Sequence, residues 1–148
     1  MIAPLDRRSG PRLSRGITLL ELVITLAIVG ILVATAQFTW REHTLRVRRG
    51  DATRGLLTLA AAQEAFYLET GRYSANVTDP PPRGLGLPGT ENGWYRLRVI
   101  AADTGGFTAV ASPAPGSPQA RDEDCQRFML DHRGLRDAAP GGAQRCWR

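Results

Sequence analysis

An almost unbroken apolar run near the N-terminus dominates the pattern of hydrophobic and polar positions. It extends from Ile17 to Ala36, and a helix of about 20 residues rises about 30 Å, the thickness of the hydrocarbon core of a bilayer. Glu21 is the one charged residue in the run. The segment is long enough to span a membrane. The Glu21 carboxylate needs a partner, because placing a charge in lipid costs a few kcal/mol or more.

Glu21 has no basic neighbour on its own helix face. The positions three and four residues away hold isoleucines and the threonines Thr18 and Thr25. If the chain is cut between Gly16 and Ile17, the new α-amino group is positively charged at neutral pH, and a neighbouring copy can present it to Glu21. We therefore interpret Glu21 as an assembly residue that sets the stagger between subunits.

Two other interpretations of the run are open. In a secretory signal, residues 1–15 are the basic region, residues 22–33 the apolar core and residues 34–36 the cleavage site, which releases a soluble domain. A simple membrane anchor explains the length of the run and leaves Glu21 without a role. Glu21 interrupts the apolar block, and the helical pattern continues beyond it, so an assembling subunit is favoured over both.

Beyond the apolar run the hydrophobic pattern becomes one-sided. A stripe of mostly apolar residues recurs at helical spacing: Leu45, Ala52, Leu56, Leu59, Ala60, Gln63, Phe66 and Tyr67. Four residues fall largely off this stripe: Arg46, Arg49, Thr53 and Glu64. The pattern predicts one long helix from about Thr18 to about Glu69, ended by Gly71, with the stripe as its packing face. Gly50 and Gly55 could permit a bend within it.

The C-terminal half has the pattern of a small antiparallel sheet. Proline and glycine are frequent in residues 74–93, which predicts a connecting loop. Residues 94–100 alternate between apolar and basic side chains and predict a first strand. A turn at 103–105 leads to a second strand at 106–111, and a third is expected at 125–131. Packed on the helix stripe, these strands predict one compact α+β head.

The sequence from Gly16 to Leu32, GITLLELVITLAIVGIL, resembles the N-terminal signature of type IV pilins and the related pseudopilins. The resemblance implies that a prepilin peptidase removes a leader after Gly16, that Ile17 is N-methylated, and that Glu21 is needed for assembly. It also implies a long N-terminal helix, membrane-spanning in its first half, packed on a small antiparallel sheet. Two features depart from the family pattern: Ile17 replaces the usual Phe, and Phe38 stands where many major pilins have a helix-kinking proline.

The C-terminus carries a second resemblance. The pattern from Cys125 through Cys146 to Trp147 is similar to the end of PilE-type minor pilins, in which the loop between the cysteines is exposed and variable. Since the chain has two cysteines, one intramolecular disulfide is possible, and it should form on the exported side of a membrane. It is expected to stabilise the domain by about 3 kcal/mol. We expect Trp147 to pack beside it.

The positive charge of the chain belongs mostly to its first residues. The sequence has 19 basic and 14 acidic residues, but residues 1–16 contain four arginines and one aspartate, which leaves 15 basic and 13 acidic residues elsewhere. One dense basic cluster remains: Arg41, Arg46, Arg48, Arg49 and Arg54. We interpret it as a solvated helix face that also meets anionic lipid headgroups, with DNA binding as the alternative.

The acidic residues Asp122, Glu123 and Asp124, with Asp131, are the candidate ligands for Ca²⁺, which the major pseudopilins of type II secretion bind in their C-terminal loops. Consecutive acids on a strand point in different directions, and the spacing of an EF-hand loop is absent, so we interpret them as a solvated charge run. We predict no metal and no cofactor. The sequence has no nucleophile elbow and no phosphate-binding glycine loop, so we do not expect an enzyme.

Together these features predict a structural subunit of a type IV pilus. The C-terminal resemblance and the absent proline favour a minor pilin over the bulk subunit. Its expected parts are a leader at 1–16, an N-terminal helix at 17–50 and a globular head at 51–148. A type II secretion pseudopilin and a membrane-anchored module that binds DNA or another ligand are the alternatives.

The resemblance also implies where the subunit acts and with what. The expected partners are other pilin subunits, the prepilin peptidase and methylase, the inner-membrane assembly machinery and membrane lipid, with DNA as a further candidate. The chain is expected in the bacterial inner membrane before assembly and in a cell-surface pilus afterwards. There it would support twitching motility, adhesion or DNA uptake, which fold alone does not distinguish.

Overall fold

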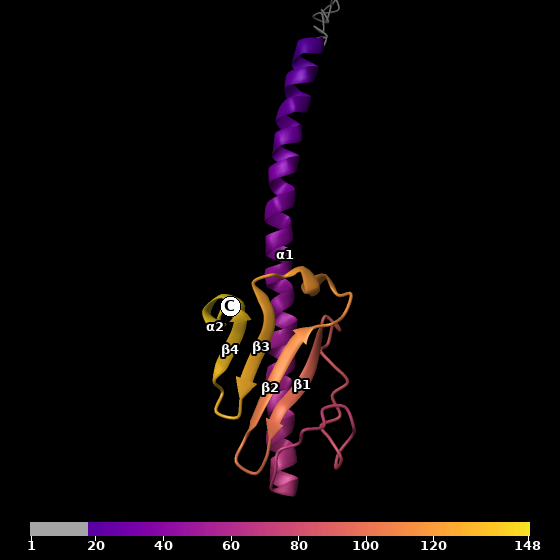
Figure 1. Cartoon of the computed structure of the whole chain (residues 1–148). Coiled ribbons are helices and arrows are strands. Elements are labelled where there is room, and N and C mark those ends of the chain that lie inside the picture. Colours follow the sequence, from indigo (N-terminus) through magenta and orange to yellow (C-terminus); the bar gives the residue numbers. More distant parts are fainter. Residues whose placement is uncertain (1–17) are drawn as a thin grey trace, which may run out of the picture. The chain divides into compact units, whose positions relative to one another are not determined.

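The computed structural model describes residues 18–148, apart from the side chains of residues 36–39 (Figure 1). A long helix, α1 (Leu19–Thr70), precedes a four-stranded sheet. The strands are β1 (Tyr95–Ala102), β2 (Phe107–Pro113), β3 (Cys125–Asp131) and β4 (Arg136–Pro140). Two short helices complete the fold: a 3-10 turn, η1 (Pro118–Arg121), before β3, and α2 (Ala143–Cys146) after β4.

The chain divides into two compact units, residues 1–39 and residues 40–148. In the first unit, the described side chains of α1 are all exposed, and the most apolar window of the helix has a mean hydropathy of 2.5. By length and composition α1 could cross a membrane, although a signal sequence near an N-terminus has the same properties. The helix predicted for the apolar run is confirmed from Leu19 onward.

The second unit contains an antiparallel meander with strand order β1-β2-β3-β4 (Figure 1). The register places Leu97 opposite Ala111 and Ala109 opposite Leu130. The three expected strands are confirmed, and β4 is a fourth that the sequence pattern missed. Residues 136–140 contain no β-branched or aromatic side chain, so their extended conformation depends on pairing with β3.

The predicted stripe of α1 is the face that packs on the sheet. Its most buried apolar members form the core with residues of the sheet: Ala52, Leu56, Leu59 and Phe66. The polar Gln63 of the same stripe is also buried. Arg49, expected off the stripe, is also buried, with 7% of its surface exposed. It lies four residues after Leu45 and three before Ala52, so helical spacing places it on the same face.

The glycines of α1 serve packing and termination. α1 is continuous through Gly50 and Gly55, and a Cβ at Gly55 would lie 2.6 Å from the Thr90 methyl group in the connecting loop. The close approach lets the Thr90 hydroxyl accept a hydrogen bond from the Tyr95 N–H and donate one to the Tyr95 carbonyl, at the start of β1. Gly71 follows the helix with φ +72°, as expected for a left-handed C-terminal residue.

Residues 74–93 form neither helix nor strand, which confirms the predicted loop. The loop is attached to α1 by a buried amide. Gln63 donates from Nε2 to the Ser74 carbonyl at 2.7 Å and accepts the Ser74 N–H at Oε1 at 2.8 Å. Both backbone groups of Ser74 are therefore satisfied although the residue is buried, and the loop begins without an unpaired polar group there.

Candidate functional site

Glu21 lies in the first turn of α1, with an exposed side chain. Its backbone N–H donates to Thr18 Oγ1 at 3.2 Å, so Thr18 caps the described start of the helix. Within residues 18–148, no basic side chain forms an ion pair with its carboxylate. The predicted cleavage and methylation residues, Gly16 and Ile17, lie outside the described residues.

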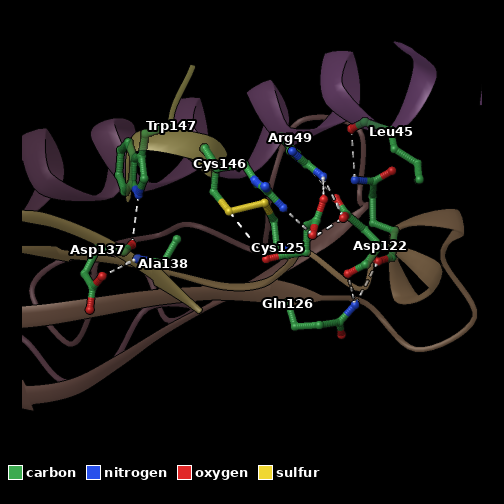
Figure 2. Close-up of a disulfide and its surroundings, with 12 residues drawn as sticks. Leu45, Arg49, Asp122, Cys125, Gln126, Asp137, Ala138, Cys146 and Trp147 are labelled. Carbon is green, nitrogen blue, oxygen red and sulfur yellow. Dashed lines mark hydrogen bonds and ion pairs between the residues drawn. A yellow bond between two sulfur atoms is a disulfide. The ribbon is translucent and has the colours of Figure 1, made fainter. Parts of the chain in front are cut away.

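The second unit contains a buried ion pair between α1 and the segment before β3 (Figure 2). Arg49 donates from Nε to Asp122 Oδ2 at 2.7 Å and from Nη2 to Asp122 Oδ1 at 2.8 Å. Asp122 is 1% exposed, and its Oδ1 also accepts the N–H of Cys125. The hydrogen bond with Asp122 raises the pKa of Arg49 above its usual value, although burial opposes the rise. The Arg49 guanidinium therefore stays charged at physiological pH.

A disulfide between Cys125 and Cys146 adjoins this ion pair and links β3 to α2 (Figure 2), which confirms the expected pairing. Next to it, Arg145 Nη1 lies 2.9 Å from Asp124 Oδ1, and Arg49 Nη2 lies 3.7 Å from Asp124 Oδ2. The disulfide and these charges connect the C-terminal segment to β3 and α1.

Trp147 lies beside this region, as expected. Its ring is 6.2 Å from that of Phe128, centre to centre, in an edge-on arrangement, and its Nε1 donates to the Asp137 carbonyl at 2.9 Å (Figure 2). The indole thus covers the core and pairs its N–H with the edge strand β4.

The interpretation of the acidic residues as a solvated charge run was wrong for Asp122. The three acids precede β3 instead of lying on a strand, and Asp122 is buried against Arg49. Asp131 lies apart, at the end of β3. Desolvation raises its pKa, but hydrogen bonds from Leu135 and Arg133 outweigh this and hold the pKa below its usual value. Within residues 18–148, no three Asp, Glu, His or Cys residues are grouped to hold a metal ion.

The predicted basic cluster was also wrong as a single solvated face, because the helix distributes its arginines over different surfaces. Arg49 is buried, and Arg54 borders a hollow beside the loop residues Gly89 to Glu91. Arg41 and Arg48 are two turns apart on one face, whereas Arg46 faces elsewhere. The Arg48 guanidinium lies 5.0 Å from the ring centre of Trp94. The arginines of this cluster outside the core therefore border three separate hollows, two of which are lined by more than one exposed arginine.

We call the first hollow the C-terminal cleft. It has a volume of about 520 Å³ and is lined by Glu42, Arg46, Arg49, Asp124, Gln144, Arg145 and Arg148. We call the second the Trp40 groove. It has a volume of about 420 Å³ and is lined by Trp40, Arg41, Thr44, Leu45, Arg48, Pro118 and Arg121. The cleft mixes both charge signs, whereas the groove has three arginines and no acid among its lining residues.

Two family models match this chain. The one described as "Type IV minor pilin ComP, DNA uptake sequence receptor" matches residues 39–129, more than half of the sequence. The chain belongs to the type IV pilin family. The second, described as "Prokaryotic N-terminal methylation motif", matches residues 11–36. The resemblance identified from the N-terminal signature is thereby confirmed, and the family is one of structural proteins, not of enzymes.

Individual pilins are similar over part of their length. The major pilin PilA of Myxococcus xanthus is 34% identical over 113 residues, which cover 74% of this chain and 48% of PilA. The major pilin PilE1 of Neisseria gonorrhoeae is 37% identical over 102 residues, covering 66% of this chain and 53% of PilE1. The chain spans about half the length of these curated relatives.

A solved type IV pilin from Shewanella oneidensis is 28% identical, with a TM-score of 0.47, and the similarity covers 70% of this chain and 98% of that one.

The minor pilin match over residues 39–129 includes both partners of the buried ion pair, Arg49 and Asp122, and the first cysteine of the disulfide. The disulfide was predictable from the sequence because the chain has two cysteines. Sequence reasoning missed the ion pair, and it also missed the buried Gln119, whose Nε2 donates to the Tyr95 hydroxyl at 2.8 Å and to the Leu45 carbonyl. The position of Arg49 within the stripe was the available signal, since a charged residue on a buried helix face requires a partner.

Proposed function

We propose that this pilin is a minor subunit of a type IV pilus that assembles through its N-terminal helix. The observation that carries the proposal is the exposed apolar part of α1, which contains Glu21 without an ion-pair partner in residues 18–148. Such a surface is stable in lipid or against other helices, and the carboxylate requires a cation from outside the described chain. The methylation-motif match at residues 11–36 supports this interpretation.

We propose three functional segments: a leader at 1–16, an assembly helix at 17–50 and an exported head at 51–148. Cleavage between Gly16 and Ile17 frees the α-amino group of Ile17, which becomes N-methylated. That amine, on an incoming or neighbouring subunit, pairs with Glu21 as the helix passes from membrane lipid into the fibre. The inner-membrane assembly machinery and the prepilin peptidase and methylase act on the subunit before it reaches the cell surface.

The mass of the exported chain tests the processing step. Loss of residues 1–16 with gain of one methyl group is expected. A chain that begins at Gln37 would instead establish a secretory signal and a released domain, and a chain that keeps residues 1–16 would establish a simple anchor.

Replacement of Glu21 tests the assembly step. Glu21→Gln keeps the shape and removes the charge, so the subunit should be processed and membrane-inserted but absent from sheared fibres. Thr25→Ala is the matched control, because Thr25 lies one turn further along the same face and bonds only the Leu22 carbonyl within the described chain. Incorporation of the Glu21 variant at the control level would refute the assembly role.

We propose DNA as a further partner of the second unit, residues 40–148. The family description names a DNA uptake sequence receptor, and the C-terminal cleft supplies Arg46, Arg145 and Arg148, whose guanidinium groups suit phosphates. Arg145 is engaged by Asp124, so Arg46 and Arg148 are the available cations.

A salt titration of duplex binding tests this partner. Replacing Arg46 and Arg148 with glutamine should reduce the slope of log affinity against log salt by about 1 for each arginine that contacts a phosphate. Arg98→Gln, on the exposed side of β1, is the control. Equal slopes in all variants would remove the cleft from DNA binding. Fibres that persist after gene deletion, with DNA uptake lost, would support the receptor role over the structural one, whereas lost protein secretion would support a pseudopilin.

A further inference from the structure

The Trp40 groove combines an exposed aromatic ring with cations of one sign. The Trp40 side chain belongs to α1 and is 73% exposed, an unusual position for so large an apolar surface in water. Arg41 and Arg48 come from the same helix, and Arg121 comes from the last turn of η1. Two elements that are distant in sequence therefore bring three arginines to one hollow.

The lining of the groove favours an amphipathic anion over a purely ionic one. Trp40, Leu45 and Pro118 supply apolar walls, and the arginines supply donors for phosphate oxygens. Tryptophan rings of this kind are enriched where a bilayer meets water, because one part of the ring is apolar and its N–H is polar. Arg48 lies against Trp94, which orients its guanidinium.

The covalent chain restricts how far this groove can lie from a membrane. Trp40 follows the end of the apolar run at Ala36 by four residues, and four residues span at most about 14 Å even when fully extended. This limit holds whatever the arrangement of the two units. When the apolar run spans a bilayer, the groove is therefore within reach of the phosphates of the nearer leaflet.

We propose that the Trp40 groove binds the phosphate headgroup of an anionic phospholipid while the subunit is anchored in the membrane. The proposal rests on the membrane-anchored stage of the proposed function and names a partner for the head at that stage. Arg41 and Arg121 contact the phosphate, and Trp40 lies among the glycerol and upper acyl groups. The contact holds the head on the exported face and is lost when the subunit is extracted into a fibre.

Headgroup cross-linking tests the proposal with the full chain in vesicles. A phosphatidylglycerol that carries a photoreactive headgroup should label peptides from residues 40–48 and 118–121. Arg121→Gln should reduce the labelling about fivefold, the effect of removing one basic residue near an anionic surface, and Arg121→Lys should retain most of it. Arg98→Gln, which removes the same charge from the exposed side of β1, is the matched control and should label as the unaltered chain does.

Three results would overturn the headgroup site. They are labelling that is equal in the Arg121→Gln and unaltered chains, equal labelling by a photoreactive phosphatidylcholine, and displacement by a short DNA duplex in an Arg121-dependent way. The last would assign the groove to nucleic acid. Resistance of the chain to alkaline extraction from the vesicles is measured in parallel. A chain that washes off overturns the membrane function itself, whereas a retained chain without Arg121-dependent labelling overturns the groove alone.

Discussion

Replacement of Arg49 is expected to be among the most damaging single substitutions in the second unit, residues 40–148. Arg49→Met retains much of the volume and apolar stem of the side chain but removes the guanidinium. The Asp122 carboxylate, which is 1% exposed, then keeps only the hydrogen bond from the Cys125 N–H within residues 18–148. Removing one partner of a buried ion pair costs about 3–5 kcal/mol, because the other charge stays desolvated. Since a domain of this size is stable by about 5–15 kcal/mol, the loss is a large fraction of the total.

The double variant separates desolvation from attraction. In Arg49→Met with Asp122→Leu neither charge of the pair remains, and the free energy of unfolding should return to within about 1–2 kcal/mol of the unaltered chain. Asp122→Leu alone should likewise cost about 3–5 kcal/mol, so the two single losses together should exceed the loss in the double variant by at least about 4 kcal/mol, which is the coupling energy between the two sites. Arg46→Met, an exposed neighbour on the same helix, is the control and should change the stability by less than about 0.5 kcal/mol.

These free energies are measured by urea unfolding of the full chain in mild detergent. Tryptophan fluorescence monitors the transition, and the disulfide is kept intact. A loss below about 1 kcal/mol for Arg49→Met would show that water or a neighbouring group replaces the guanidinium. A double variant as unstable as the sum of the two single variants would show that the sites act independently. Either result would refute the interpretation of the pair as a buried electrostatic link.

Three further outcomes are expected from the head. Replacing Cys125 and Cys146 with serine should lower the free energy of unfolding by about 3 kcal/mol, and an unchanged urea midpoint would contradict this. Burial raises the pKa of Tyr95 to about 12, so the folded state keeps a proton that the unfolded state loses above about pH 10. Stability should therefore fall by about 2 kcal/mol as pH rises through that interval, and Tyr95→Phe should flatten the fall in alkaline urea titrations. Gly55→Ala should cost about 1–3 kcal/mol in thermal unfolding through its clash with the loop, whereas Gly50→Ala, with only a flexible arginine nearby, should not destabilise.

Local pattern was sufficient for most of the secondary structure. The extent of α1 followed from unbroken apolar character and then from helical spacing, and its end followed from Gly71, because one residue with positive φ stops a helix. The first three strands followed from alternation and turn residues. β4 did not, because residues 136–140 lack strand-forming side chains and obtain their hydrogen bonds from β3.

The candidate sites were predictable where one residue type was scarce. Two cysteines permit one pairing, and one carboxylate in an apolar run is conspicuous, so both were identified from the sequence alone. The arginines were too numerous for that. Helical geometry buries Arg49, places Arg48 against Trp94 and directs Arg41 and Arg46 to separate hollows. Arginines that are close along the chain are therefore not close in space.

The sequence by itself determined a long helix with an apolar first part, the carboxylate within it, the strands of the meander up to β3 and the possible disulfide, since each is a property of neighbouring residues or of a count. Only the tertiary structure decided that Arg49 pairs with Asp122 across 73 residues, and that Arg121 of η1 meets Arg41 and Arg48 of α1 at one groove. The physical reason is that charged residues look alike along a chain. Which of them is desolvated, and against which partner, depends on the packing of elements that are distant in sequence.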